Sequence, residues 1–174
     1  MRVIAGEFRS RRIQGVPGLA TRPTPDRLRE TLFDILAARI EGASFLDGYA
    51  GTGAVGIEAL SRGARHAWFL ERNLAALQVL RENLTALALE LRATVVPGPV
   101  LQNLSRLTVD LVFLDPPYDK EREYEAALSL LAETSPALVV VQHSVRLDLQ
   151  KAYGRLYHTR IVKQGDNALS FFGP

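Results

Sequence analysis

The sequence predicts an α/β fold, in which helices cover a mostly parallel sheet of seven strands. Two observations support this prediction. From Ser44 onward, short apolar segments alternate with amphipathic ones, which is the pattern of strands and helices in a parallel sheet. The segment 137–141 is rich in valine and suits a strand that is buried on both faces.

The first twenty residues are predicted to form a small basic β-hairpin, and residues 21–174 the main domain, as one compact unit overall. Apolar residues stand among arginines over 2–16, and Gly6 or Ser10 lies near the expected turn.

A rigid connector and a helix are expected next. The connector is Arg-Pro-Thr-Pro at 22–25, because each proline biases the residue before it away from helix. Thr24 is expected to be the N-cap and Pro25 the first helical residue. The helix should run to about Arg39, because apolar residues recur on one of its faces. These residues are Leu28, Leu32, Ile35 and Leu36.

The remaining elements are assigned by the same periodicities. One helix is expected through Ile57 and Leu60, a second after the capping residue Asn73, and a third over 121–133. No helix separates the last two strands, so these should pair antiparallel. The expected strands cover 45–46, 68–70, 94–96, 110–114, 137–141, 156–162 and 168–172.

The composition excludes several kinds of chemistry. The chain has no cysteine, which rules out disulfides, thiolate metal sites and a cysteine nucleophile. Its three histidines are far apart in sequence, so we expect no metal centre. No apolar run approaches the roughly 20 residues that span a bilayer, and the N-terminus lacks an apolar signal-peptide core. A cytoplasmic monomer without a membrane partner is therefore expected.

Positive charge is concentrated near the N-terminus, although the net charge of the chain is only +2. Seven of the first thirty residues are arginines, which can neutralise and grip phosphates. The alternative is a general preference for arginine over lysine throughout the chain. We expect Arg9, Arg11 and Arg12 to contact nucleic-acid phosphates. For Arg22, a place at the entrance for the nucleic acid or beside a bound ligand is set against the alternative of a solvated arginine.

A glycine-rich loop, DGYAGTGAVG at 47–56, contains the G-x-G-x-x-G spacing of dinucleotide sites. A pyrophosphate at this loop would lie close to Asp47, and the repulsion at roughly 4 Å is about 4 kcal/mol at an effective dielectric near 20. S-adenosylmethionine instead carries an ammonium and a sulfonium, which Asp47 would attract. The loop therefore favours this methyl donor over NAD, and over a merely structural turn.

Glu71 ends the second strand and is placed to accept hydrogen bonds from both ribose hydroxyls of a bound nucleoside. This role fits NAD equally well, so Glu71 supports a nucleoside without choosing between the two. The residues expected to contact the cofactor are Asp47, Tyr49, Gly51, Thr52, Gly53, Glu71, Arg72 and Gly98.

The second informative motif is Asp115-Pro116-Pro117-Tyr118, at the end of the fourth expected strand. A carboxylate and a backbone carbonyl held in a rigid turn can accept both N–H bonds of an exocyclic base amine and aim its lone pair at a methyl group. Asp115 and the Pro116 carbonyl are the candidates, and Asp115 can also take the proton. Tyr118 is placed to stack on a flipped base, worth about 1–3 kcal/mol in comparable sites. Methylation at pyrimidine C5 is excluded, since it needs a cysteine thiolate.

These motifs together resemble the bacterial 16S ribosomal RNA guanine-N2 methyltransferases, the small-subunit methyltransferase D family. The resemblance covers nearly the whole chain, and its most specific segments are RVIAGEFRSRRI and FLDPPY. It implies a class I, Rossmann-like methyltransferase fold, S-adenosylmethionine as donor, and a guanine of 16S rRNA or the small ribosomal subunit as acceptor. It also suggests that the basic hairpin helps to hold RNA.

The chain departs from the family pattern at two positions. Pro99 stands where the family commonly has the acid that meets the adenine amino group, so adenine must be held by backbone and apolar contacts. Gln142 replaces the usual Glu, and no charged role is carried over to it. His143 is expected to be a polar strand-end residue. Asp166 and Asn167 are expected to form a turn without chemistry.

Other functions remain open on the sequence. The same motif serves enzymes that methylate adenine N6 or cytosine N4 in DNA, but these usually need a target-recognition domain for which this chain has no room. Protein-glutamine methyltransferases typically carry Asn-Pro-Pro-Tyr and a helical N-terminal domain, whereas this chain has Asp115 at the first position of the motif and an expected hairpin at its N-terminus. A non-catalytic RNA-binding factor on the same scaffold is the alternative from a different class, and Pro99 is the one feature that hints at it.

Overall fold

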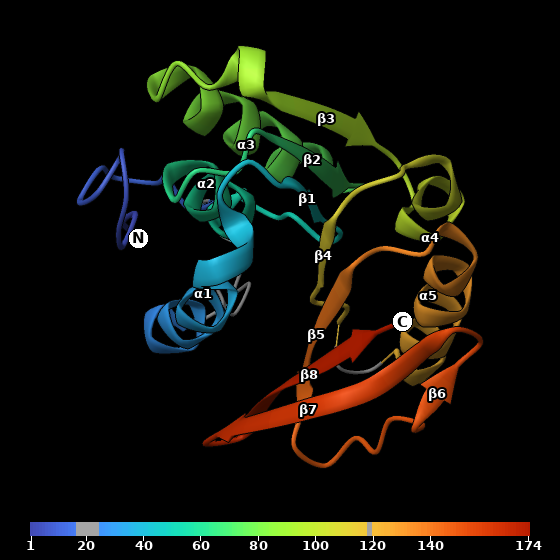
Figure 1. The fold of residues 1–174 in the computed structure, drawn as a ribbon. Helices are drawn as coiled ribbons and strands as arrows, with labels where there is room; N and C mark the ends of the chain where they lie inside the picture. The colour runs from blue at the N-terminus through green and yellow to red at the C-terminus, as the bar shows by residue number, and fades with distance from the viewer. Residues whose placement is uncertain (17–24, 118–119) are drawn as a thin grey trace.

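The computed structural model describes residues 1–16, 25–117 and 120–174 and contains one eight-stranded sheet (Figure 1). The strand order is β3-β2-β1-β4-β5-β8-β7-β6. The first five strands in this order are parallel, and β8, β7 and β6 are antiparallel. The strands are β1 (Ser44–Asp47), β2 (His66–Glu71), β3 (Ala93–Pro97), β4 (Leu111–Leu114), β5 (Leu138–Ser144), β6 (Ala152–Tyr153), β7 (Leu156–Gln164) and β8 (Asn167–Gly173).

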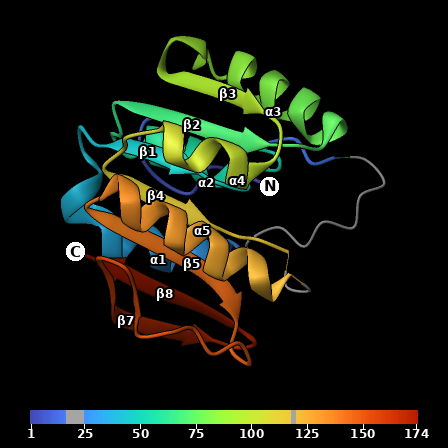
Figure 2. The same cartoon turned by 90° about the vertical axis from the view of Figure 1, so that its right-hand side faces the viewer.

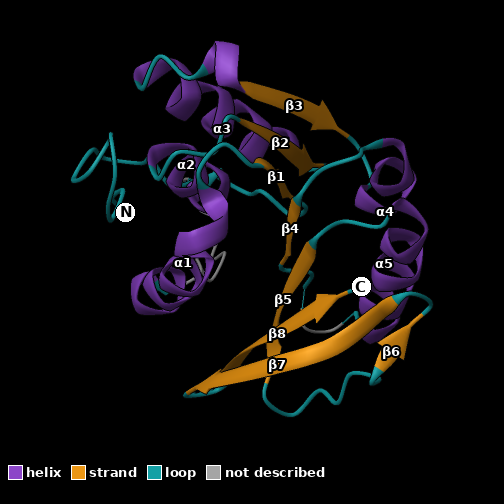
Figure 3. Cartoon of the chain, in the orientation of Figure 1, coloured by secondary structure: helices purple, strands orange, loops and turns teal. Residues whose placement is uncertain are grey.

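Helices cover both faces of the sheet (Figures 1 and 2). On one face lie α1 (Asp26–Ile40), α2 (Ala54–Ser61) and α3 (Leu74–Ala86), and on the other α4 (Val100–Asn103) and α5 (Glu121–Thr134). Two short 3-10 turns, Glu90–Arg92 and Leu104–Arg106, complete the helical elements of the described residues. Figure 3 shows the resulting layers of helix, sheet and helix. None of the described helices is long and apolar enough to cross a membrane.

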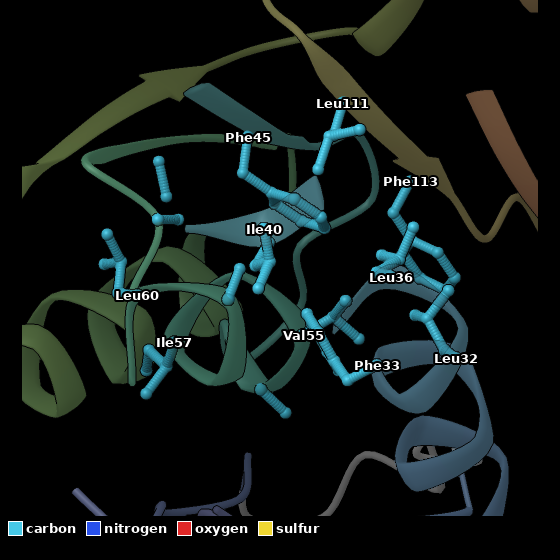
Figure 4. Close-up of a cluster of buried hydrophobic side chains, with 14 of the residues drawn as sticks. Leu32, Phe33, Leu36, Ile40, Phe45, Val55, Ile57, Leu60, Leu111 and Phe113 are labelled. Atoms are coloured by element: carbon cyan, nitrogen blue, oxygen red, sulfur yellow. The ribbon is translucent and has the colours of Figure 1, made fainter. Parts of the chain in front are cut away.

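Each face of the sheet has its own hydrophobic core. Under α1 and α2, the fully buried Leu32 and Phe33 lie in a cluster that reaches Phe45 and Phe113 of the sheet (Figure 4). Under α4 and α5, Tyr124 and the β5 valines Val139 and Val141 belong to the second cluster. Burial of residues 138–141 of β5 on both faces of the sheet explains why these four residues are all apolar.

The register of the strands brings several polar side chains to the carboxyl ends of the parallel strands and to one face of the sheet. Asp47 ends β1, and Asp115 follows β4 directly. Leu114 pairs with Val141, which puts Gln142 beside Asp115 across the sheet, and Asn167 opens β8 opposite Ser144. Successive residues of a strand point to opposite faces. Asp47, Asp115, Gln142 and Asn167 therefore share the face that α1 and α2 cover.

The N-terminal residues form a chain reversal rather than a regular hairpin. A single antiparallel bridge joins Arg2 to Arg12, and Ser10 in the turn has a φ of 68°. Val3 and Ile13 are buried in the core under α1 and α2. We call residues 1–16 the N-terminal segment.

Helix α2 anchors this segment. The side chain of Glu58 is fully buried and accepts hydrogen bonds from the N–H groups of Ile4 (2.8 Å) and Ala5 (3.0 Å). The Ser61 hydroxyl accepts from the Phe8 N–H at 3.0 Å. The segment therefore packs along α2, the helix that follows the glycine-rich loop.

Several local expectations are confirmed. Asn73 caps α3 by accepting from the Ala76 N–H at 3.0 Å. β7 and β8 pair antiparallel, and α1 ends at Ile40, before Gly42. The helix expected after Asn73 is α3, and four leucines at helical spacing along it and at its C-cap are all buried: Leu77, Leu80, Leu84 and Leu87.

Other expectations were wrong. The sheet has eight strands because β6 adds a two-residue strand at its edge. Pro25 is the N-cap residue of α1 rather than its first helical residue, while Thr24 lies outside the described residues. Arg29 does not belong to the basic surface. It is fully buried, and its Nη2 donates to the Arg2 carbonyl at 2.6 Å and to Asp26 at 3.1 Å.

Candidate active site

A cavity of about 790 Å³ opens at the carboxyl ends of β1, β2 and β4. This is the edge at which open α/β sheets bind their ligands, close to the point where strand order reverses between β1 and β4. The volume lies within the range of small-molecule sites. The N-terminal segment and the start of α1 supply part of the wall through Met1, Gly15, Val16 and Pro25.

The glycines of the loop have distinct physical roles. Gly51 has a φ of 53° and would meet no heavy atom within 4 Å if it carried a Cβ, which leaves room for a close ligand. Gly53 is the N-cap of α2 with a φ of 83°, and a Cβ there would collide with Leu80. At Gly56 a Cβ would collide with the Phe69 ring, so this glycine permits close packing of α2 on β2. Of these three glycines, Gly51 alone lines the cavity.

Asp47 is a buried carboxylate in the cavity wall, with 1% of its surface exposed. Its Oδ2 accepts from the Gly56 N–H at 2.9 Å. Burial raises the pKa of Asp47 to about 7, the Gly56 hydrogen bond opposes this rise, and the negative charge of Glu71 adds to it. A cationic group bound in the cavity would favour the ionised carboxylate. The arrangement therefore suits a positively charged ligand.

Glu71 lies at the end of β2 and organises the loop. Its Oε2 accepts from the Gly51 N–H at 2.8 Å, and its Oε1 accepts from the N–H groups of Arg72 (2.8 Å) and Asn73 (2.7 Å). A carboxylate has about four acceptor positions. Glu71 thus holds the glycine-rich loop against β2 and retains acceptor capacity for a ribose hydroxyl.

Tyr49 and Glu123 join the loop after β1 to helix α5. The Tyr49 hydroxyl donates to Glu123 Oε1 at 2.9 Å, and both residues line the cavity. Burial, followed by this carboxylate, raises the pKa of the Tyr49 phenol above its ordinary value. The phenol therefore stays protonated and acts as a fixed hydrogen-bond donor in the wall.

The turn after β4 brings Asp115, Pro116 and Pro117 into the cavity. The carbonyl of Pro116 accepts a hydrogen bond from the Tyr124 hydroxyl at 3.0 Å, and the Tyr124 side chain is fully buried. Because a carbonyl oxygen has two lone pairs, one remains for a ligand. Tyr118 lies outside the described residues.

Two carboxamides for which the sequence predicted no role also line the cavity. Gln142 and Asn167 are 3% and 7% exposed. Asn167 was expected in a turn, but it is the first residue of β8. The signal that could have identified it is its place at the start of a strand antiparallel to β5, which puts it beside the carboxyl end of β5.

His143 takes no part in the cavity wall. It is buried, with Nε2 at 2.8 Å from the Ser170 hydroxyl and Nδ1 at 2.8 Å from the Ser144 carbonyl. Burial lowers the pKa of the imidazole. These contacts are those of a structural residue that joins β5 to β8.

The structure brings most of the expected cofactor residues together, and the roles assigned to them remain predictions. Asp47, Tyr49, Gly51, Thr52, Glu71 and Arg72 line the cavity. Gly53 and Gly98 lie next to lining residues without lining it themselves. Pro99 is in the wall with Val100 and Leu101, so this part of the wall is apolar.

The expected RNA contacts lie apart from the cofactor residues. Arg9, Arg11 and Arg12 are exposed on the N-terminal segment, and none of the three lines the cavity. The Nη2 of Arg11 donates to the Ala86 carbonyl at 3.1 Å. Arg22 lies outside the described residues. Within the described ranges, no group of three or more potential metal ligands was found.

Comparison with known proteins decides the family. The model of the family described as conserved hypothetical protein 95 matches residues 1–173. The ribosomal RNA small subunit methyltransferase D of Escherichia coli K12 is 37% identical over 83% of this chain and 75% of its own length. The chain belongs to the small subunit methyltransferase D family.

Other proteins similar to this chain agree with it in length and structure. The Bacillus subtilis protein YlbH is 36% identical over 99% of this chain and 98% of its own length. The solved structure of Escherichia coli yhhF superposes with a TM-score of 0.86 at 35% identity, and the match covers 99% of this chain and 96% of that one. The fold is thus a class I methyltransferase fold, as the resemblance implied.

Proposed function

We propose that the protein transfers a methyl group from S-adenosylmethionine to the exocyclic N2 amine of a guanine in 16S ribosomal RNA. The proposal rests on one observation: a single cavity is lined both by groups that suit the methyl donor and by groups that suit an amine acceptor. A glycine-rich loop with two carboxylates lies at one part of its wall, and the Asp115-Pro116-Pro117 turn lies at another. Relatives named as ribosomal RNA methyltransferases support the nature of the acceptor.

The residues on the donor side fit S-adenosylmethionine. Asp47 would attract its ammonium, Glu71 would accept from the ribose, and Gly51 leaves space for close approach. Pro99, Val100 and Leu101 would hold adenine by backbone and apolar contacts. When bound, the donor supplies an electrophilic methyl group on its sulfonium.

The residues on the acceptor side would prepare the amine. The Asp115 carboxylate and the Pro116 carbonyl would accept its two N–H bonds, which favours a pyramidal nitrogen with its lone pair free for the methyl carbon. Asp115 would then take the proton that the amine loses. The main contribution of the protein is to hold the two reactants in line. Tyr118 is proposed to stack on the flipped base.

Guanine is proposed from the family resemblance, and the side chains beside Asp115 are compatible with it. Next to its N2 amine, guanine carries an N1–H donor and an O6 acceptor, whereas adenine and cytosine carry a ring-nitrogen acceptor beside their amines. Gln142 and Asn167 lie on the same face as Asp115, and a carboxamide contains both acceptor and donor atoms. We propose that this pair accepts from N1–H and donates to O6.

The exposed Arg9, Arg11 and Arg12 of the N-terminal segment are proposed to hold rRNA phosphates, with Arg22 at the RNA entrance. The partner is 16S rRNA, free or in the small ribosomal subunit. We propose that the protein acts on it as a monomer in the cytoplasm, as a single compact domain.

Transfer of a labelled methyl group from S-adenosylmethionine tests this function. The acceptors are small ribosomal subunits that lack the modification, free 16S rRNA and duplex DNA, with Asp115→Ala as control. Label on guanine N2 of the RNA or subunit, lost in the variant, is the expected result. Label on DNA alone, or on another base, would contradict the assignment.

A further inference from the structure

The side chain of Asn83 joins three parts of the chain that are distant in sequence. Asn83 lies on α3 and is buried, with 2% of its surface exposed. Its Oδ1 accepts from the Gln14 N–H at 2.8 Å, and its Nδ2 donates to the carbonyls of Gln14 (3.1 Å) and Thr52 (3.0 Å). The one carboxamide thus binds both the N-terminal segment and the glycine-rich loop.

Both segments that Asn83 binds continue directly into the cavity wall. Thr52 itself lines the cavity, and so do Gly15 and Val16, the residues that follow Gln14. Because Gln14 is fixed at its N–H and at its carbonyl, Asn83 sets where Gly15 and Val16 stand relative to the loop. The N-terminal segment is therefore a wall of the donor site as well as a carrier of exposed arginines.

The rest of the segment is anchored by further polar contacts. Glu58 binds the N–H groups of Ile4 and Ala5, and Arg92 Nη1 forms an ion pair of 2.9 Å with Glu7. Arg9, Arg11 and Arg12 lie between these anchors and Gln14. A ligand that binds the arginines and a ligand that fills the cavity thus act on the same short length of chain.

We propose that Asn83 is a positioning residue that links the donor cavity to the N-terminal segment, so that binding of donor and binding of RNA strengthen each other. This inference rests on the proposed function for the identity of the two ligands. Linkage of this kind is reciprocal, so it can be measured from the donor side alone. Coupling in proteins commonly amounts to about 5-fold to 150-fold in affinity.

Calorimetric titration with S-adenosylhomocysteine, with and without a 16S rRNA transcript, tests the proposal in the wild type and in Asn83→Leu and Asn83→Ala. In the wild type, RNA should tighten binding about fivefold or more. In both variants, binding without RNA should weaken on the order of tenfold, the size expected for a lost buried hydrogen-bond set, and the effect of RNA should disappear.

Two variants serve as controls. Ser44→Ala removes the hydroxyl that donates to Asp110 Oδ2 at 2.7 Å and accepts from the Asp110 N–H at 2.8 Å, at the opposite end of β1, so it lowers stability without touching the cavity. Gln14→Ala leaves the contact intact, because Asn83 binds only the backbone of Gln14. Both should keep wild-type coupling. Unchanged S-adenosylhomocysteine binding in the Asn83 variants, or coupling that survives in them, overturns the inference and leaves the proposed function standing. A wild type that binds no S-adenosylhomocysteine contradicts the proposed function itself.

Discussion

The hydroxyl of Tyr124 donates a hydrogen bond of 3.0 Å to the carbonyl of Pro116. Tyr124 belongs to the second turn of α5, and Pro116 belongs to the turn that presents the acceptor groups. The contact fixes the orientation of the carbonyl that is proposed to receive the base amine, and it leaves one lone pair for that amine. Helix α5 therefore takes part in placing the acceptor although Tyr124 itself is outside the cavity wall.

Tyr124→Phe should lower kcat about tenfold and leave the affinity for S-adenosylmethionine unchanged. The ring still fills its place in the core, but the Pro116 carbonyl loses the bond that orients it. Single-turnover methyl transfer and donor titration measure the two quantities separately. Tyr153→Phe is a matched control, because its hydroxyl accepts from the Gln150 N–H at 3.1 Å, far from the acceptor turn. Equal losses in the two variants would argue against a positioning role.

The affinity for S-adenosylhomocysteine should fall about tenfold between pH 8 and pH 6. Its ammonium binds best to ionised Asp47, whose pKa of about 7 in the ligand-free protein leaves the carboxyl mostly protonated at pH 6. Titration calorimetry over this range measures the effect. Asp47→Asn should bind more weakly at pH 8 and show a flat profile, and a profile like that of the wild type would contradict this account.

The same carboxyl should make stability depend on pH in the opposite direction from an ordinary surface acid. The pKa of Asp47 is raised on folding, so the folded state holds the proton more tightly than the unfolded state. Its contribution to stability is greatest below the ordinary pKa near 4 and is lost as pH rises through about 7. Asp47→Asn should therefore raise the Tm of the ligand-free protein more at pH 8 than at pH 5.

Replacing Arg9 and Arg12 together by alanine should weaken RNA binding and lower its salt dependence by about 1.5 units of slope, because two phosphate contacts are lost. The affinity for S-adenosylhomocysteine in the absence of RNA should not change. Filter binding over a range of salt concentrations gives the slope. Arg39→Ala removes an exposed charge at the far end of α1 and should leave the slope unaltered.

A substrate analogue tests whether Gln142 takes part in recognition of the base. Once the modified guanine is mapped, it can be replaced by 2-aminopurine, which keeps the N2 amine but lacks N1–H and O6. The wild type should prefer guanine about tenfold or more in kcat/KM, since each lost hydrogen bond is worth about 1 kcal/mol. Gln142→Leu should reduce this preference, because the change should lower kcat/KM mainly for the guanine substrate and little for the 2-aminopurine substrate. A preference of unchanged size would remove Gln142 from base recognition.

Features determined by neighbouring residues could be predicted from the sequence. The cap at Asn73, the leucines of α3 and the buried valines of β5 follow from local periodicity and chemistry. The glycine loop and the turn at Asp115 were found because each motif stands at the end of an apolar strand. The parallel arrangement of these strands then predicts that both motifs lie at the carboxyl ends, where α/β sheets bind their ligands.

Features that depend on distant partners could not be predicted. Arg29 and Glu58 have the spacing of ordinary helix-surface charges, and only the packing of the N-terminal segment buries them. Asn83 is one polar residue on a helix, and its role depends on Gln14 and Thr52, which are 69 and 31 residues away. Strand β6 has two residues, too few to show a period.

The anchoring of the N-terminal segment also constrains the order in which the chain can fold during synthesis. Residues 1–16 leave the ribosome well before the residues that hold them, since Glu58 follows Ile4 by 54 positions and Arg92 follows Glu7 by 85. Until then, the buried side chains of Val3 and Ile13 have no core to enter. The N-terminal segment therefore cannot reach its native packing until α2 and the residues after α3 have been made.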